Sequence, residues 1–326
     1  MKYLVTGGAG FIGSHLSEKL LKNGNEVIII DNFNSYYNPE IKRDNINEVK
    51  KTAEEYHAKC TVIEGDIRNL EDLDKAFKLN PDIIVHLAAM AGVRPSIENE
   101  KLYWDVNIIG TQNIFEKCKE YDIKKVVFAS SSSVYGNNPT VPFKVTDKID
   151  NPISPYAATK KAGELLCHTH YHLYDVNVAC LRFFTVFGPR QRPDLAINKF
   201  TRMILNDEPI PVFGDGTTSR DYTYIDDIVD GIMGAIQWID TPEKKYGIFN
   251  LGGDEPVNLS RMIEVIEKTL GKKAIINRLP MQPGDVNRTC ADISLSTTEL
   301  GYKPKTSFEE GIAKFVEWYK MQDKKG

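Results

Sequence analysis

The chain has 326 residues, of which 41% are hydrophobic and 26% charged, a composition that supports a large buried core. Its formal net charge is -4, and Lys and Arg are spread along the chain, so we expect neither nucleic acid nor an anionic membrane as a partner. Met1 is not followed by a secretory leader, and the apolar runs are far shorter than the roughly 20 residues of a membrane span. We therefore expect a cytoplasmic protein of one or two domains.

Short β-branched segments alternate with segments of helical spacing along the first part of the chain. The expected strands are residues 2–6, 27–31, 61–65, 82–88, 125–130 and 176–183. The expected helices are residues 12–23, 70–79, 106–121 and 156–174. Because the strands are apolar on both faces, this alternation predicts an α/β fold with a Rossmann-type doubly wound parallel sheet covered by helices.

The pattern loosens from about Gly188, where prolines interrupt it, and helices resume near Asp226 and Leu259. We therefore expect residues 1–187 to form the sheet domain, with later segments near 221–251 returning to it. Residues 188–326 would then form mainly a smaller C-terminal lobe.

A glycine-rich turn stands between the first expected strand and the first expected helix. Gly7 permits the turn, Gly10 lets the backbone approach a pyrophosphate, and Gly13 allows close packing of helix on strand. Asp31 closes the second strand, where its carboxylate can accept hydrogen bonds from both hydroxyls of an adenosine ribose. The same carboxylate would repel a 2'-phosphate, so this arrangement predicts NAD rather than NADP.

A second motif combines Tyr156 and Lys160, which would share one face at the start of a helix capped by Ser154 and Pro155. A nearby ammonium and a positive nicotinamide ring would lower the pKa of Tyr156 and make it a base for a sugar hydroxyl. The pair is common by chance in surface helices. The serine run at 130–133, which ends the fifth strand, raises its significance because hydroxyls there can relay a proton.

The cysteines and histidines do not indicate a metal site. Cys60, Cys118, Cys167, Cys180 and Cys290 are scattered without paired spacing, and we interpret them as reduced thiols. His168, His170 and His172 lack a recognisable ligand motif, so we expect an exposed polar helix face and no bound metal.

Together, the glycine turn, Asp31, the serine run and the Tyr156–Lys160 pair resemble the extended short-chain dehydrogenase/reductase family of nucleotide-sugar epimerases and dehydratases. The resemblance covers essentially the whole chain and continues through residues 182–193, 212–216, 220–222 and 282–286. By resemblance, the catalytic residues are Tyr156, Lys160 and Ser131. Those expected to bind NAD are Gly7, Gly10, Phe11, Ile12, Gly13, Asp31, Asn32, Asp66, Ile67, Leu87, Ala88, Ala89, Asn107, Tyr156 and Lys160.

Within this family the serine run indicates the reaction. Dehydratases resemble this chain but carry an Asp-Glu pair where Ser132 and Ser133 stand, and UDP-glucuronate decarboxylases tend to have a glutamate at the position of Ser133. The resemblance therefore implies an isomerase that inverts C4 of a UDP-hexose through a transient 4-keto sugar. In it, Tyr156 takes the proton of the 4-hydroxyl and NAD exchanges a hydride with C4.

Substrate identity follows from weaker signals. The segments at 91–94, 190–192 and 282–286 look most like those of UDP-glucuronate 4-epimerases. Arg220 and Arg288 are candidates for the diphosphate, since guanidinium groups match phosphate geometry. The residues expected to bind substrate are Arg94, Ser132, Ser133, Thr185, Arg192, Asn198, Lys199, Val212, Phe213, Arg220, Asp285 and Arg288.

Several alternatives stay open at this point. A UDP-glucose or UDP-N-acetylglucosamine 4-epimerase is the first alternative, and the small Thr289 leaves room for an N-acetylated or larger sugar. A UDP-glucuronate decarboxylase, a net oxidoreductase and a non-catalytic NAD-binding scaffold are others. The resemblance also implies a homodimer formed through the helices near 99–118 and 156–172.

Overall fold

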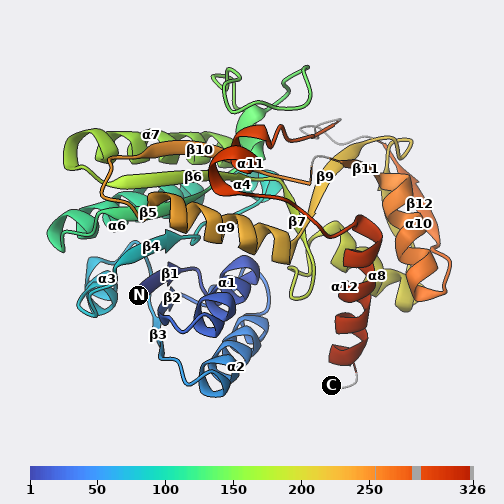
Figure 1. Ribbon diagram of the computed structural model, residues 1–326. Helices are drawn as coiled ribbons and strands as arrows, with labels where there is room; N and C mark the ends of the chain where they lie inside the picture. Colours follow the sequence, from blue (N-terminus) through green and yellow to red (C-terminus); the bar gives the residue numbers. More distant parts are fainter. Residues whose placement is uncertain (254, 281–287, 324–326) are drawn as a thin grey trace.

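The computed structural model describes residues 1–253, 255–280 and 288–323 (Figure 1). Seven of the described strands form the main sheet: β1 (Lys2–Thr6), β2 (Glu26–Asp31), β3 (Cys60–Glu64), β4 (Ile83–His86), β5 (Lys125–Ser131), β6 (Asn177–Phe183) and β10 (Tyr246–Leu251). Their order is β10-β6-β5-β4-β1-β2-β3, and all neighbouring pairs are parallel. The expected Rossmann-type parallel sheet is confirmed.

Helices cover both faces of this sheet. The helices of the described chain are α1 (Phe11–Lys22), α2 (Pro39–Glu55), α3 (Leu70–Phe77), α4 (Val93–Glu98), α5 (Glu100–Trp104), α6 (Gly110–Glu120), α7 (Pro155–Tyr174), α8 (Ala196–Leu205), α9 (Ile225–Ile239), α10 (Leu259–Leu270), α11 (Ser294–Leu300) and α12 (Phe308–Asp323). A π-helical turn, η1 (Asp105–Ile109), joins α5 to α6, and a 3-10 turn, η2 (Ser132–Tyr135), follows β5.

Alternate residues of each central strand enter two different cores. Val5 and Ile29 pack with apolar residues of α1, α2 and α9 on one face of the sheet. Leu4 and Ile28, their neighbours along β1 and β2, pack with residues of α3, α6 and α7 on the other face. Successive side chains of a strand point to opposite faces, so strands with two buried faces need continuous apolar runs.

The remaining strands lie on the C-terminal side of the chain. β7 (Thr185–Phe187), β9 (Ser219–Tyr224) and β11 (Pro256–Asn258) form one small sheet, and β8 (Ile210–Phe213) and β12 (Ile276–Leu279) form another. With α8, α10 and α12 they lie beside the main sheet (Figure 1). α9 and β10 instead join the main sheet, since β10 pairs with β6 and α9 packs against β5 and β6.

Local sequence explains the start of the helix that carries the Tyr-Lys motif. The Ser154 hydroxyl accepts a hydrogen bond of 3.1 Å from the Ala157 N–H, and Pro155 occupies the first helical position, as predicted. The helix ends at Asp175, which adopts the left-handed conformation. The cap at Ser154 places Tyr156 in the first turn of α7, beside the end of β5.

Candidate active site

The turn after β1 brings backbone atoms into unusually close contact. Gly7 has φ +69, and a Cβ on Gly7 would lie 2.9 Å from the Ala88 Cα. A Cβ on Gly13 would lie 2.3 Å from the Gly7 carbonyl oxygen, whereas one on Gly10 would lie 3.2 Å from it. The turn therefore exposes the first N–H groups of α1 without side chains in front of them, a cradle suited to a pyrophosphate.

Asp31 lies at the carboxyl end of β2, beside this turn. Its carboxylate is buried and accepts hydrogen bonds from the Ala9 N–H at 3.1 Å and the Phe33 N–H at 2.9 Å. Burial raises the pKa of Asp31, and these two hydrogen bonds and the charge of Lys42 partly offset that rise. The sequence anticipated a ribose-binding carboxylate here; the structure adds that the same group holds the turn.

Asp66 follows β3 at the same edge of the sheet. Arg68 binds its carboxylate through two guanidinium nitrogens, and Asn32 donates to it at 2.9 Å. These contacts, the Arg68 hydrogen bond above all, lower the pKa of Asp66 to about 2. Ile67 is buried against Gly110, where a Cβ would lie 2.5 Å from the Ile67 Cδ1.

A buried polar chain crosses the sheet behind the segment Leu87–Ala89, and the sequence analysis missed it. The Thr111 hydroxyl donates to the Asn107 carbonyl, so it accepts from His86 Nε2 at 3.0 Å. His86 Nδ1 then accepts from the Thr6 hydroxyl at 2.7 Å, and Thr6 accepts from the Ala88 N–H. Burial, with the charge of Lys160, lowers the pKa of His86 to about 3 and keeps it neutral.

Asn107 projects from the π-helical turn η1 into this buried region. Its side chain exchanges two hydrogen bonds with the backbone of Met90, of 2.8 and 3.0 Å, and donates a third to Thr159 at 3.0 Å. The amide thus links the segment after β4 to α7. One predicted cofactor residue is therefore also a bridge between two elements of the site.

Tyr156 and Ser131 meet where β5 ends and α7 begins. The Ser131 side chain hydrogen-bonds to the Tyr156 hydroxyl, and Ser131 Oγ lies 3.2 Å from Ser133 Oγ. The Tyr103 ring packs edge-on against Tyr156, with ring centroids 6.2 Å apart. The structure thus brings together the phenol and the serine run that the sequence analysis paired.

Burial dominates the electrostatics of both Tyr156 and Lys160 in the protein without cofactor. Burial raises the pKa of Tyr156, and the Ser131 hydrogen bond and the charge of Arg192 partly offset that rise. Lys160 is itself fully buried, burial lowers its pKa to about 8, and its ammonium donates to the Ala129 carbonyl rather than to Tyr156. Lys160 Nζ lies 6.0 Å from the Tyr156 ring centroid, and the joint effect of this ammonium and a bound nicotinamide ring on the pKa of Tyr156 stays a prediction.

A buried ion pair supports the serine run from behind, and it too was missed. Glu164 binds the Arg182 guanidinium at 2.8 and 2.9 Å and accepts a hydrogen bond from Ser130 at 2.7 Å. Arg182 also donates to the Tyr135 hydroxyl, which donates to Asn250 at 2.7 Å. The network ties α7, β5, β6 and β10 together. Its sequence signal was Glu164, a charged residue within the apolar face of α7.

The expected substrate residues fall into several groups. Ser132 and Ser133 lie in η2, Thr185 lies in β7, and Val212 and Phe213 lie in β8. Arg94, in α4, places its guanidinium 5.4 Å from the Phe213 ring centroid, so a residue that follows β4 of the main sheet meets one of β8.

Other residues expected to bind substrate also contact neighbouring residues of the protein. Arg220 donates to the Ser219 carbonyl, and Arg288 forms a backbone bridge with Ser219. Asn198 is buried and donates to the Gln191 carbonyl at 2.6 Å, so it also holds the loop before α8. Lys199 is partly exposed on α8. Asp285 and the segment 282–286 lie outside the described residues.

Arg192 reaches the tyrosines around the site. Its guanidinium lies 5.1 Å from the Tyr36 ring centroid and is paired with Asp194. Its positive charge lowers the pKa values of Tyr36, Tyr103 and Tyr156, in each case against a larger rise caused by burial. Arg192 therefore contacts Tyr36 directly, and its charge extends to Tyr103 and Tyr156.

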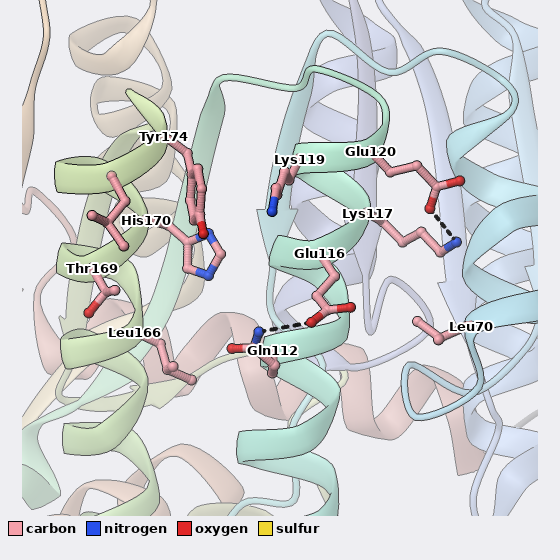
Figure 2. Close-up of a pocket in the computed structure, with 11 residues that line it drawn as sticks. Leu70, Gln112, Glu116, Lys117, Lys119, Glu120, Leu166, Thr169, His170 and Tyr174 are labelled. Carbon is pink, nitrogen blue, oxygen red and sulfur yellow. Dashed lines mark hydrogen bonds and ion pairs between the residues drawn. The ribbon is translucent and has the colours of Figure 1, made fainter.

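A separate hollow of about 550 Å³ lies between α6 and α7, away from these residues. Figure 2 shows Glu116 and Lys119 of α6 facing His170 and Tyr174 of α7. His170 is buried and stacks on Phe115, with ring centroids 4.5 Å apart, so it is not part of an exposed polar face. Among the described residues, no cluster of His, Cys, Asp or Glu could hold a metal ion, and no helix could cross a membrane.

The comparison with protein families agrees with this geometry. Residues 3–252 match the NAD dependent epimerase/dehydratase family. The chain belongs to this family. The resemblance inferred from the glycine turn, the serine run and the Tyr-Lys pair is confirmed.

Relatives extend this result over the full length. UDP-glucuronate 4-epimerase of Thermodesulfobacterium geofontis is 44% identical over 98% of this chain and 96% of its own. UDP-glucuronate 4-epimerase 4 of Arabidopsis thaliana is 45% identical over 97% of this chain and 74% of its own. The crystal structure of UDP-glucuronic acid 4-epimerase from Bacillus cereus, in complex with UDP-glucuronic acid and NAD, is 38% identical. It matches with a TM-score of 0.89 over 99% of this chain and 100% of that one.

Proposed function

We propose that the protein is an NAD-dependent isomerase that inverts C4 of UDP-glucuronate to give UDP-galacturonate. The observation that carries the proposal is the full-length likeness to the Bacillus cereus enzyme, whose structure contains UDP-glucuronic acid and NAD. The serines at 131–133 agree with it, because the run offers hydroxyls and no additional carboxylate for elimination chemistry.

The residues around the first two strands fit NAD. Gly7, Gly10 and Gly13 leave the start of α1 open to a pyrophosphate, with Phe11 and Ile12 in its first turn. Asp31 and Asn32 would hold the adenosine ribose, and Asp66, Ile67, Leu87, Ala88, Ala89 and Asn107 would contact the rest of the cofactor. When bound, NAD supplies the hydride acceptor and donor for C4.

Tyr156 would take the proton from the sugar 4-hydroxyl and return it after the sugar has turned. Ser131 holds the phenol in place and can share its proton. Lys160 is fixed by the Ala129 carbonyl on the inner side of the site, where its ammonium can bind the nicotinamide ribose. The three groups come from two elements only, β5 and α7, which makes their spacing rigid.

The UDP-sugar would lie between the main sheet and the C-terminal lobe. We assign the diphosphate to Arg220 and Arg288, and the uridine to Asn198, Lys199, Val212 and Phe213, with Arg94 beside Phe213 and Asp285 in the segment outside the described residues. We assign the hexuronate carboxylate to Ser132, Ser133 and Thr185. Neutral hydroxyl donors suit an anion that must leave and rebind during rotation.

The domain division extends this proposal. Residues 1–187, completed by segments near 221–251, would bind NAD, and residues 188–326 would mainly bind the nucleotide sugar. The position of β10 and α9 on the main sheet supports it. We also propose a cytoplasmic location, which the unpaired state of the five cysteines, all within the described residues, supports.

We further propose a homodimer formed through α5, α6, η1 and α7. Large apolar side chains are exposed on α5, η1 and α7: Trp104, Ile109, Leu165 and Leu173. Large apolar side chains exposed on the helices of one expected interface favour its use in association. Light scattering on the intact protein should give a mass near twice 36.8 kDa, and Leu165→Glu should lower it to that of one chain. An unchanged mass for the Leu165→Glu variant would contradict this interface.

The decisive experiment follows C4 inversion by proton NMR. The purified protein is incubated separately with UDP-glucuronate, UDP-glucose and UDP-N-acetylglucosamine, with no added NAD and then with added NAD. Conversion of UDP-glucuronate alone supports the proposal. Preferential inversion of a neutral sugar would replace the substrate but keep the reaction, whereas release of CO2 would make the protein a decarboxylase.

Tyr156→Phe serves as the matched variant because it removes only the phenolic hydroxyl. We expect it to lower kcat by about a thousandfold while UDP-glucuronate still binds. Net accumulation of reduced cofactor, followed by absorbance, would identify an oxidoreductase instead.

A further inference from the structure

Arg192 and Asp194 form a two-point ion pair within the loop between β7 and α8. Arg192 Nε donates to Asp194 Oδ1 at 3.0 Å, and Nη2 donates to Oδ2 at 2.7 Å. The arginine side chain is 17% exposed and the aspartate side chain 42%. One edge of the guanidinium is therefore occupied by the protein's own carboxylate, and the Nη1 side is not part of this pair.

The loop that carries this pair is anchored without it. Asn198 donates to the Gln191 carbonyl at 2.6 Å, and Gln191 donates to the Val186 carbonyl at 3.0 Å. Before Gln191, Arg190 pairs with Glu18 of α1 at 2.6 Å. These contacts hold the residues before Arg192 to β7, α1 and the start of α8, and none of them involves Asp194.

The guanidinium of this pair lies over the Tyr36 ring, and its charge acts on two further tyrosines of the site, Tyr103 and Tyr156. The carboxylate of Asp194 acts on Tyr36 and Tyr103 with the opposite sign. The pair therefore presents a partly neutralised cation to whatever lies beside Tyr156.

An arginine with no carboxylate partner of its own would hinder the rotation of a bound hexuronate. Its planar fork binds a carboxylate at two points, and such a contact would stabilise the bound sugar before it turns. Stabilising the ground state without the transition state raises the barrier to turnover. A carboxylate of the protein bound to the same guanidinium weakens that two-point contact, while the guanidinium still attracts the sugar carboxylate.

On the basis of the proposed function, we propose that Asp194 is a positioning and specificity residue: it occupies the Nε/Nη2 edge of Arg192 so that the guanidinium attracts a uronate carboxylate without holding it. Asp194 does not touch the substrate itself. It acts through Arg192, and its effect requires a charged sugar.

The test uses Asp194→Asn, which keeps the shape of the side chain and removes its charge. Asp230→Asn is the matched control, because Asp230 pairs with Lys19 at 3.2 Å, is 47% exposed and belongs to α9. The KM and kcat for UDP-glucuronate are measured in the intact enzyme. Dissociation constants of UDP-glucuronate and UDP-glucose are measured by calorimetry in Tyr156→Phe protein, with and without each substitution.

We expect Asp194→Asn to tighten UDP-glucuronate binding by about fivefold, to lower KM and kcat by similar factors, and to leave UDP-glucose binding unchanged. Asp230→Asn should change none of these. Equal changes for both sugars, or unchanged binding of the charged sugar, would overturn the inference. If wild-type protein does not invert UDP-glucuronate, the proposed function fails, while the calorimetric contrast between the two sugars still tests Asp194.

Discussion

The ammonium of Lys160 donates a hydrogen bond of 2.7 Å to the backbone carbonyl oxygen of Ala129. Ala129 stands two residues before Ser131 on β5, and Lys160 stands one helical turn after Tyr156 on α7. This single contact therefore sets the helix that carries the phenol against the strand that carries its hydrogen-bonding serine. The contact also gives the buried ammonium a hydrogen-bond acceptor, although burial lowers the pKa of Lys160 to about 8.

The first prediction concerns Lys160→Met. We expect kcat for the epimerisation to fall by roughly a hundredfold, because the helix loses its anchor and the ribose its ammonium. In the wild-type enzyme the lysine loses its charge as pH rises through about 8, so kcat should decline above that pH. The variant should lack that alkaline decline. Profiles from pH 6 to 10 check this, with Lys161→Met on the same helix as control; a decline that persists in Lys160→Met would contradict it.

The second prediction separates two glycines of the cofactor turn. Gly13→Ala places a methyl group 2.3 Å from the Gly7 carbonyl oxygen, so we expect a loss of roughly 2 kcal/mol or more in the free energy of unfolding. Gly10→Ala meets the same oxygen at 3.2 Å and should cost less than about 1 kcal/mol. It should still weaken NAD binding by roughly tenfold, because a side chain then stands before the pyrophosphate.

Urea denaturation of the NAD-free proteins and calorimetric titration with NAD measure the two effects separately. Equal destabilisation by both substitutions would show that the turn tolerates no side chain at all, contrary to the distances.

The third prediction tests the buried pair between Glu164 and Arg182. Glu164→Gln leaves a buried guanidinium without its counter-charge, so we expect a loss of about 3–5 kcal/mol in the free energy of unfolding. Both side chains are 1% exposed, so solvent screening is slight. Glu264→Gln, which breaks a pair on the surface of α10, should barely change stability. A small loss for Glu164→Gln in chemical denaturation would mean that the network is not required for the fold.

The fourth prediction follows from the neutral, buried His86. Its pKa is about 3 in the folded protein and 6.5 when unfolded, so the unfolded state binds the additional proton. Stability due to this group is complete above pH 6.5 and is lost as pH falls toward 3. Between pH 7 and pH 5 the wild-type protein should lose about 2 kcal/mol through His86 alone.

His86→Gln should remove this component, so the variant's free energy of unfolding should depend less on pH. Urea denaturation at the two pH values measures the difference, with the exposed His172→Gln as control. Identical pH dependence of wild type and His86→Gln would rule out the buried neutral histidine as its source.

Elements with a strong local signal were predictable. The strand at Lys2–Thr6 and the helix that begins at Pro155 follow directly from apolar runs and from the Ser154 cap. The helix α2 was missed because its apolar residues are few and its charged residues many. The available signal was Asn38 before Pro39: the Asn38 side chain caps the helix by accepting from the Glu40 N–H.

One expected helix had the correct position, but the prediction missed a change of helix type within it. Residues 106–121 were expected to be a single helix, whereas the structure has a π-helical turn at Asp105–Ile109 before α6. The turn lets Asn107 direct its amide to Met90 and Thr159. These partners lie 17 and 52 residues away along the chain, so the local pattern contained no trace of them.

The sequence alone was sufficient for the α/β class, the glycine turn with its acid, and the Tyr156–Lys160 helix, because each depends on periodicity, capping or backbone sterics within a few residues. The tertiary structure alone determined which charges act on which groups. It directed Lys160 to the Ala129 carbonyl, placed Arg192 over Tyr36 with Asp194 bound to its guanidinium, and buried Glu164 against Arg182. Such pairings depend on burial and on distances between segments far apart in the chain. Both quantities arise only when the sheet and its helices have packed.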